Sequence, residues 1–584
     1  MDRRIVLTMA TLLVWSQVGA GFASLPAAGS VNRVRMHLHN RLEDVETSQT
    51  LGVAGEPIQA SVLLPRFYAR RQYQPAWSGT AGPLPHVERF LTVLSEAEHE
   101  GLRPPDYHLG AIATTLAEVR HAQHQQQTFD PARLADLDLL LSDAFLTYGL
   151  HLLVGHSYPQ AIDAAWFAAH PEADIAHLLQ QALETDHLPE ALRSLVPPQP
   201  GYAALRQALA HYRQIAARGG WPTIADGPTL RQGDQSERVA ALRMRLQTTG
   251  ELEVEDVGEA DLFDEALERA VRTFQQRHGL TVDGVVGPAT RAALNVPVEA
   301  RVQQIAVNLD RWRWLPQDLG SRHLLVNIAN FTLDVVEAER SVMTMRVVVG
   351  KPYHRTPVFS DTMTYLVLNP YWHVPASIAR QEIIPQVRRD PGYLAKHNLK
   401  VVQGWGTQAE EVHPQTIDWS TMTAPHFRYR FRQEPGASNA LGRVKFMFPN
   451  QFNVYLHDTP ARSLFAKSRR AFSHGCVRLE KPVELATYVL RDDPHWSRNR
   501  LLAAMTSGVR RAVRLPAPLP IHLVYRTAWV ETDGAVHFRA DLYGHDTPSG
   551  FCGSTSCGIV DGMWCSSEDH TTIVRPPTGF DSGH

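Results

Sequence analysis

Cysteine is scarce in this chain of 584 residues, which contains only four. Three of them, Cys552, Cys557 and Cys565, lie close together near the C-terminus, so Cys476 is the single cysteine of the preceding sequence. This scarcity excludes a disulfide framework in the body of the protein. It also leaves the Cys476 thiol without an intramolecular partner before the tail, so the thiol stays available for chemistry.

An excess of charge of either sign is also absent. The 57 Lys and Arg residues against 60 Asp and Glu residues give a formal net charge of -3, which provides no footprint for nucleic acid or an anionic membrane surface. The hydrophobic fraction of 44% and the charged fraction of 20% are those of an ordinary globular protein. Beyond the N-terminus no segment offers about 18 uninterrupted apolar residues, so we expect no further membrane span.

Several motifs are missing. The chain has no Walker loop, no dinucleotide fingerprint and no His-Glu-x-x-His helix, and we expect no cofactor. His457, His474 and Cys476 carry atoms that could bind zinc, but a His-x-Cys pair without a fourth ligand at the usual spacing is not typical of a zinc site, and we expect no metal. For the three tail cysteines, a small zinc or disulfide knot is an alternative.

The first residues predict export. An arginine pair precedes the apolar stretch from Ile5 to Trp15, and small residues follow that suit signal-peptidase cleavage after Ala20 or Ala23. We therefore expect residues 1–23 to be a signal peptide. The alternative is an uncleaved signal anchor, because apolar character continues weakly beyond that stretch. Both interpretations place the rest of the chain outside the cytoplasm.

The length predicts several domains, because single cores rarely exceed about 250 to 300 residues. Apolar residues at helical spacing predict a helical region over residues 57–224. Residues 230–297 follow as a small module of three short helices, with Pro288 at the first position of the last helix. A plain helical spacer is the alternative for this module.

The second half of the chain changes from helical patterns to strands. Short β-branched runs predict a mainly antiparallel β domain over residues 322–500. Within it, residues 378–432 are richer in charge and less strand-like, and we interpret them as an insertion. Strands in residues 501–544 are expected to close the fold, and residues 545–584 are expected to be a disordered tail. The predicted fold class is therefore multidomain α+β.

Cys476 lies in the run Ser473-His474-Gly475-Cys476-Val477-Arg478, and His457 ends a short predicted strand upstream of it. A thiol attacks a carbonyl carbon only as the thiolate, and a histidine can take its proton near neutral pH. Cys476 and His457 are thus the predicted nucleophile and base. We expect the strand to bring His457 to a sheet edge, and the amides of Gly475 and Cys476 to hold a developing oxyanion. A buried structural thiol is the alternative for Cys476.

The spacing of His457 from this run resembles the signature of the L,D-transpeptidases, cysteine enzymes of bacterial peptidoglycan. Thr356-Pro357 and the segment from Asn369 to Pro375 resemble further parts of the same catalytic domain. The helical region resembles the scaffold region of the large Gram-negative members. Residues 230–297 resemble their peptidoglycan-binding module, and residues 378–432 are similar to their lid-like insertion. The tail has no such resemblance.

The resemblance implies roles for the neighbouring residues. In that family the backbone carbonyl of the residue after the base histidine, here Asp458, orients the imidazole. His474 would line the oxyanion side, and Ser473 would support the turn. Arg478 stands where some members have Asn; we expect it to contact a substrate carboxylate, because a guanidinium forms two hydrogen bonds with that group. The alternative is that Arg478 braces the helix that follows.

The resemblance also implies a reaction. Cys476 would attack the third-residue carbonyl of a tetrapeptide stem and release D-alanine, and an amine of a neighbouring stem would resolve the thioester as a 3-3 cross-link. Alternatives are an L,D-carboxypeptidase with water as acceptor, another thiol peptidase on wall peptides, and a non-catalytic peptidoglycan-binding protein. The implied partners are stem peptides and glycan, with a carbapenem adduct at Cys476. The implied location is the periplasm, with an inner-membrane anchor if the signal is uncleaved, and the oligomeric state stays open.

Overall fold

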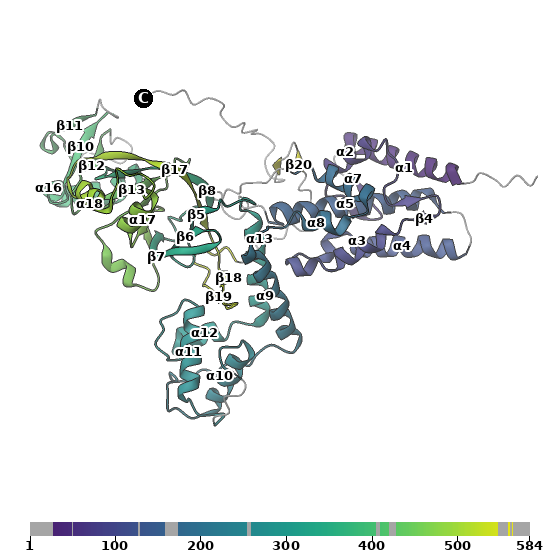
Figure 1. Ribbon diagram of the computed structural model, residues 1–584, viewed down its shortest axis with the longest axis horizontal. Coiled ribbons are helices and arrows are strands. Elements are labelled where there is room, and N and C mark those ends of the chain that lie inside the picture. Colours follow the sequence, from purple (N-terminus) through teal and green to yellow (C-terminus); the bar gives the residue numbers. More distant parts are fainter. Residues whose placement is uncertain are drawn as a thin grey trace, which may run out of the picture. The chain divides into compact units, whose positions relative to one another are not determined.

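The computed structural model describes residues 27–48, 51–125, 129–157, 173–253, 259–404, 409–419 and 428–546, with two short strands beyond them (Figure 1). The chain forms two compact units. Residues 1–89, 108–145 and 556–584 make the first, and residues 90–107 and 146–555 make the second. The predicted signal segment and the three tail cysteines lie outside the described residues.

The first unit is mainly helical and is organised around a buried carboxylate. Its helices are α1 (Ala27–Ser48), α2 (Leu63–Arg70), α4 (Leu109–His124), the start of α3 (His86–Ser95) and most of α5 (Pro131–Val154). Two hairpins, β1 (Gly52–Val53) with β2 (Glu56–Pro57) and β3 (Ser78–Gly79) with β4 (Gly82–Pro83), join them. Asp138 of α5 accepts hydrogen bonds from the amides of Ala76 and Trp77 and from the Tyr68 hydroxyl. This buried carboxylate therefore fixes the loop before β3 against the bundle.

Helix α5 is long and apolar enough to cross a membrane by composition alone. In the folded protein, however, 94% of its most apolar stretch is buried, as in the core helix of a bundle. Buried aspartates along it, including Asp138 and Asp143, fit that role because they accept hydrogen bonds from neighbouring segments.

The second unit begins with further scaffold helices. They are η1 (Ala97–Glu100), η2 (Pro104–Tyr107), α7 (Ile175–Thr185), α8 (Leu188–Arg193), α9 (Pro200–Ala217) and α13 (Val298–Arg313). Helices α9 and α13 pack through buried side chains such as Leu205, Leu209 and Ile305. The fully buried Arg313 donates to the Tyr202 hydroxyl at 2.8 Å, so even a buried guanidinium in this packing has polar partners.

The predicted small module is confirmed as three helices, α10 (Glu237–Thr248), α11 (Glu265–Arg277) and α12 (Pro288–Leu294). Asp264 caps α11 by accepting a hydrogen bond from the Leu267 amide, and Pro288 stands in the first turn of α12 as predicted. Gln275 is fully buried and accepts from the amides of Asp283 and Gly284. That amide side chain holds the turn between the last two helices against the core.

The predicted β domain is built on a nine-stranded sheet. In spatial order the strands are β15 (Ala471–Ser473), β7 (Arg340–Gly350), β16 (Val477–Leu479), β14 (Leu456–His457), β13 (Val444–Met447), β8 (Phe359–Leu368), β17 (Arg511–Val524), β5 (Arg322–Asn327) and β6 (Thr332–Glu337). Most neighbouring pairs are antiparallel, but β14 with β16, β17 with β5 and β15 with β7 are parallel. Strand β6 also pairs with β7, so the sheet closes on itself.

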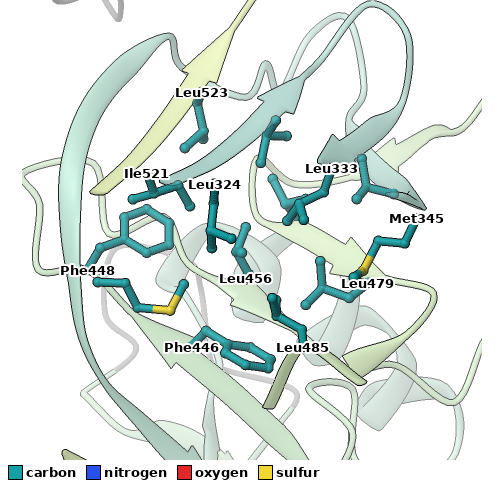
Figure 2. Packing of buried hydrophobic residues seen from close by; sticks show 14 of the residues in the cluster. Leu324, Leu333, Met345, Phe446, Phe448, Leu456, Leu479, Leu485, Ile521 and Leu523 are labelled. Atoms are coloured by element: carbon teal, nitrogen blue, oxygen red, sulfur yellow. The ribbon is translucent and has the colours of Figure 1, made fainter. Parts of the chain in front are cut away.

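One face of this sheet forms the hydrophobic core. Leu324, Leu333, Phe446, Leu456 and Leu479 meet there from different strands, with Leu485 of helix α17 (Pro482–Val489) among them (Figure 2). Helix α18 (Arg498–Thr506) adds Leu501 and Met505 to the same cluster. Because side chains alternate along a strand, the neighbours of these residues project from the opposite face.

Residues 501–544 do more than close the fold. Strand β17 lies in the interior of the sheet, between β8 and β5. The following hairpin, β18 (Ala528–Val530) with β19 (Val536–Phe538), packs on α9 and α13. The folded region extends past residue 544, where the tail was predicted to begin, because Asp546 forms an ion pair with Arg311 at 2.8 Å. Within the predicted tail, β20 (Ile559–Val560) pairs with β21 (Met563–Trp564), which differs from a wholly disordered tail.

The predicted insertion has a sheet of its own, contrary to its less strand-like pattern. Strands β11 (Glu410–Val412), β10 (Leu399–Gln403), β12 (Arg430–Gln433) and β9 (Trp372–His373) pair in that order. The helical segments α14 (Ala376–Ile378), η3 (Ala379–Ile383), α15 (Ile384–Arg389) and α16 (Tyr393–Lys396) join them around a separate core. Buried Val401 and Phe431 hold this sheet together, and the charged residues between them hid the alternation.

Candidate active site

Cys476 follows a tight turn between β15 and β16. Gly475 has φ +112°, a backbone conformation that L-residues rarely adopt, and its carbonyl accepts a hydrogen bond from the Thr356 hydroxyl at 2.8 Å. The Ser473 hydroxyl donates to the carbonyl of Cys476 at 2.6 Å and accepts from the Gly475 amide at 3.1 Å. These two hydrogen bonds of Ser473 span the turn, and the supporting role that the resemblance implies for it stays a prediction.

Thr356 ties this turn to the end of β7. Its side chain is buried and accepts a hydrogen bond from the Gly350 amide at 2.9 Å while it donates to Gly475. A Cβ on Gly350 would lie only 2.0 Å from the His354 carbonyl oxygen, so only glycine fits there. The loop that carries Thr356 is therefore pressed against the nucleophile turn, which gives Thr356-Pro357 a physical role.

His457 ends β14, and its side chain is buried, with 4% exposed. Strand β14 pairs with β13 on one side and β16 on the other, so the prediction that His457 lies at a sheet edge is wrong. The short strands β14 and β16 lie between the longer strands β13 and β7, so His457 stands in the interior of the sheet. The register sets His457 opposite Arg478 on β16, next to Val477, the residue that follows the nucleophile.

The tautomer of His457 follows from its hydrogen bond. Its Nδ1 lies 2.5 Å from the carbonyl oxygen of Asp458, which can only accept, so Nδ1 carries the hydrogen and Nε2 is left as the basic atom. Burial lowers the pKa of His457 to about 3, and the nearby charge of Arg478 acts in the same direction. The resting imidazole is therefore neutral at physiological pH, with a free lone pair.

The Asp458 carboxylate anchors that carbonyl. It accepts hydrogen bonds from the amides of Arg443 and Thr459 at 2.8 and 2.7 Å, and the Arg462 guanidinium donates to it at 2.6 Å. Its side chain fills the space where a Cβ on Gly442 would lie, and Gly442 has φ +61°. The residue predicted to orient the imidazole is thus itself held at three points.

The side chain of Cys476 is half-buried, and the charged groups that act on its sulfur are positive. Burial raises the pKa of the thiol, while contacts from the hydroxyl and backbone of Tyr455 and the positive charges of Lys445 and Arg478 lower it. Tyr455 packs edge-on against the His457 ring, with centroids 5.7 Å apart. The sulfur also makes a long contact of 3.9 Å with the Asn453 carbonyl oxygen.

The expected oxyanion amides are not equivalent. The Gly475 amide already donates to Ser473, whereas the Cys476 amide donates to no acceptor among the described residues. The free donor at the turn is therefore the amide of the nucleophile itself, and the predicted use of the Gly475 amide would require the contact with Ser473 to break.

His474 and Arg478 stand two positions before and two positions after Cys476. The Nε2 atom of His474 lies 2.8 Å from a carboxylate oxygen of Glu382 in the insertion, and its ring lies 4.7 Å from that of His354. Arg478 is half-buried, and its Nε has no hydrogen-bond partner among the described residues. Such a donor is costly to leave unpaired, so it suits an incoming acceptor better than a bracing role.

Two residues near the nucleophile were missed from the sequence. Tyr455 is two positions before His457 and directly precedes β14, and Lys445 lies opposite His457 in the β13–β14 register. The period of two along a strand could have indicated Tyr455. Lys445 needed the strand pairing, which no local pattern gives. Within the described part of the chain, no group of three His, Cys, Asp or Glu residues is arranged to hold a metal ion.

Three family models match the chain. Residues 62–209 match a "Scaffold domain", residues 235–294 a "Putative peptidoglycan binding domain", and residues 321–496 an "L,D-transpeptidase catalytic domain". The last match contains both His457 and Cys476.

The chain is also similar to individual proteins. A "Putative L,D-transpeptidase" of Haemophilus influenzae is 34% identical over 244 residues, covering 42% of this chain and 48% of that protein. The "N-acetylmuramoyl-L-alanine amidase CwlM" of Mycobacterium tuberculosis is 45% identical over 80 residues, covering 12% of this chain and 20% of that protein. The chain thus spans half the length of these relatives or less. A solved L,D-transpeptidase of Stackebrandtia nassauensis is 15% identical, with a TM-score of 0.20, over 52% of this chain and 96% of that one.

The order of the matched domains is the order predicted from the sequence, with a helical scaffold first and the β domain last. Residues 321–496 of this chain are therefore similar to an L,D-transpeptidase catalytic domain, and they follow segments that match a scaffold domain and a peptidoglycan-binding domain.

Proposed function

We propose that this protein is an exported L,D-transpeptidase that forms 3-3 cross-links between peptidoglycan stems through a thioester on Cys476. The observation that carries the proposal is a half-buried thiol that follows a glycine turn, next to a strand pair that holds a neutral imidazole with its hydrogen on Nδ1. Nucleophilic acyl transfer requires these two groups.

The first half of the reaction forms the acyl-enzyme. The Cys476 proton passes to Nε2 of His457 as the sulfur attacks the third-residue carbonyl of a tetrapeptide stem. The amide of Cys476 donates to the oxygen that becomes negative. When the tetrahedral intermediate collapses, the bond to the terminal D-alanine breaks, and His457 returns the proton to the leaving amine.

The second half transfers the acyl group. The side-chain amine of a neighbouring third residue attacks the thioester carbon while His457 accepts its proton, and the sulfur leaves as the thiolate. An amide then joins two third residues. Water in place of the amine would give a tripeptide stem, so the acceptor alone separates a transpeptidase from an L,D-carboxypeptidase.

Arg478 supports the choice of an anionic substrate. Its guanidinium has a buried donor without a partner and stands beside the nucleophile. A stem peptide carries carboxylates that could accept from such a donor in the bidentate manner of guanidinium groups. The match of residues 235–294 to a peptidoglycan-binding family supports the same polymer as substrate. Export through residues 1–23 would bring the enzyme to that polymer in the periplasm.

The experiment that tests the proposal is mass spectrometry of products from tetrapeptide-bearing peptidoglycan fragments. Cross-linked dimers with an amide between two third residues are expected from the wild-type protein and should be absent with Cys476→Ala. Tripeptides without dimers would indicate a carboxypeptidase. Unchanged fragments would contradict catalysis and leave a wall-binding protein. Carbapenem treatment should add one covalent adduct to the peptide that contains Cys476.

A further inference from the structure

Lys445 lies on the site face of the sheet. In the antiparallel register of β13 and β14 it is directly opposite His457. Its neighbours Val444 and Phe446 are fully buried in the core, so the alternation of side chains turns Lys445 to the opposite face, with His457. This half-buried lysine therefore points to the side of the sheet that carries the nucleophile.

Lys445 has no counter-ion among the described residues. Its Nζ lies 3.6 Å from the centre of the Tyr455 ring, and no described carboxylate or hydrogen-bond acceptor contacts it. Removing an ammonium from water without an anion is costly, and an aromatic face offsets only about 0.5 to 2 kcal/mol of that cost. Burial accordingly lowers the pKa of Lys445 to about 8, and the group that opposes this shift is Cys476.

Among the described residues, the other groups that act on the charge of the sulfur are cationic or neutral. Arg478 faces it from β16 and Tyr455 from the segment before β14. His457 is neutral, and Arg510, which precedes β17, adds a second positive charge near Lys445. The anion that can balance this cluster from within the protein is the thiolate of Cys476.

We propose that the Lys445 ammonium is the cation that stabilises the Cys476 thiolate. The proton leaves Sγ for Nε2 of His457 or for water, and Lys445 acts in its protonated form, so its effect is present below about pH 8 and is lost as the pH rises through that value. This inference deepens the proposed function, but it depends on that function only in taking Cys476 as a nucleophile. The thiol can be measured without any wall substrate.

The test is the pH profile of Cys476 alkylation by iodoacetamide in the full-length protein. The thiolate displaces iodide, so the rate follows the thiolate fraction. Peptide-resolved mass spectrometry is needed, because Cys552, Cys557 and Cys565 also carry thiols. In Lys445→Met the midpoint should move up by about one pH unit, which slows alkylation about tenfold below the midpoint.

The controls separate charge from structure. Lys445→Arg should keep the wild-type midpoint, and so should Lys400→Met, which removes a lysine that pairs with Glu411 in the insertion. Lys445→Gln is a second neutral variant, with circular dichroism as the check on folding. A wild-type alkylation profile in both neutral variants would overturn the proposal. So would a raised KM with unchanged alkylation, because that result assigns Lys445 to a substrate carboxylate.

Discussion

His474 of the nucleophile turn and Glu382 of the insertion are joined at 2.8 Å between Nε2 and a carboxylate oxygen. Burial lowers the pKa of His474, so the neutral ring donates its Nε2 hydrogen to Glu382 at physiological pH. The contact links the insertion, which has its own hydrophobic core, to His474, two positions before Cys476. Loss of this link should loosen the insertion without changing the sulfur.

Replacing Glu382 by Ala is therefore expected to raise the rate at which a bulky maleimide reaches Cys476, and to leave the rate with iodoacetamide unchanged. An exposed pair contributes about 0.5 kcal/mol, which corresponds to roughly a twofold change. Glu411→Ala is the matched control, because it removes a carboxylate from an ion pair of the same length within the insertion. Equal maleimide rates in all three proteins would refute a covering role for the insertion.

Asp458→Ala should impair catalysis through the orientation of His457. The substitution leaves the buried amides of Arg443 and Thr459 without their acceptor, and each such loss costs about 1 to 3 kcal/mol. We expect a lower free energy of unfolding and a kcat that falls more than KM changes, measured by denaturant titration and steady-state kinetics. Asp458→Asn keeps an acceptor for one amide, so its stability and kcat should lie between those of the wild type and of Asp458→Ala. A normal kcat in the alanine variant would show that the backbone holds the carbonyl unaided.

Thr356→Val tests the link between β7 and the nucleophile turn. Valine has nearly the same shape but cannot accept from Gly350 or donate to Gly475, so a loss of about 1 to 3 kcal/mol in unfolding free energy is expected. Turnover should fall as the turn loses its fixed position, while Thr356→Ser should retain most of both properties. If the free energy of unfolding drops and turnover does not change, then the hydrogen bonds of Thr356 stabilise the fold but do not position the turn for catalysis.

The depressed pKa of His457 predicts a pH dependence of stability. The folded state binds no proton at this site until about pH 3, whereas an unfolded histidine does so near 6.5. The unfolded state therefore holds more protons between these values, so the free energy of unfolding should fall on acidification below about pH 6.5. His457→Gln should weaken that slope, which denaturant titrations at several pH values would measure. Parallel curves for the two proteins would contradict the burial of a neutral imidazole.

The sequence predicted those features that depend on local spacing. The three-helix module, the position of Pro288 and the turn at Gly475 each follow from a short pattern. The pairing of strands that are distant in the chain could not be predicted from such patterns. The edge position expected for His457 failed because β16, which follows the nucleophile in the chain, pairs beside β14. Lys445 entered the site only through its register with His457.

The predictions for the insertion and for the C-terminal strands were incomplete for related reasons. Charged residues broke the alternation of β10 and β12, although buried Val401 and Phe431 still form a core. Residues 501–544 carried a strand pattern but no sign of where β17 would insert. Sequence patterns of this kind identify a strand more readily than its neighbours.

The interior position of β17 also sets when the enzyme can exist. Strands β8 and β5 have no neighbour between them until residues 511–524 arrive, and these residues come after the nucleophile in the chain. A nascent or partly translocated chain that already displays Cys476 therefore has a thiol but no finished sheet to hold its turn. The sheet that holds the Cys476 turn is therefore complete only after residues 511–524 have been added.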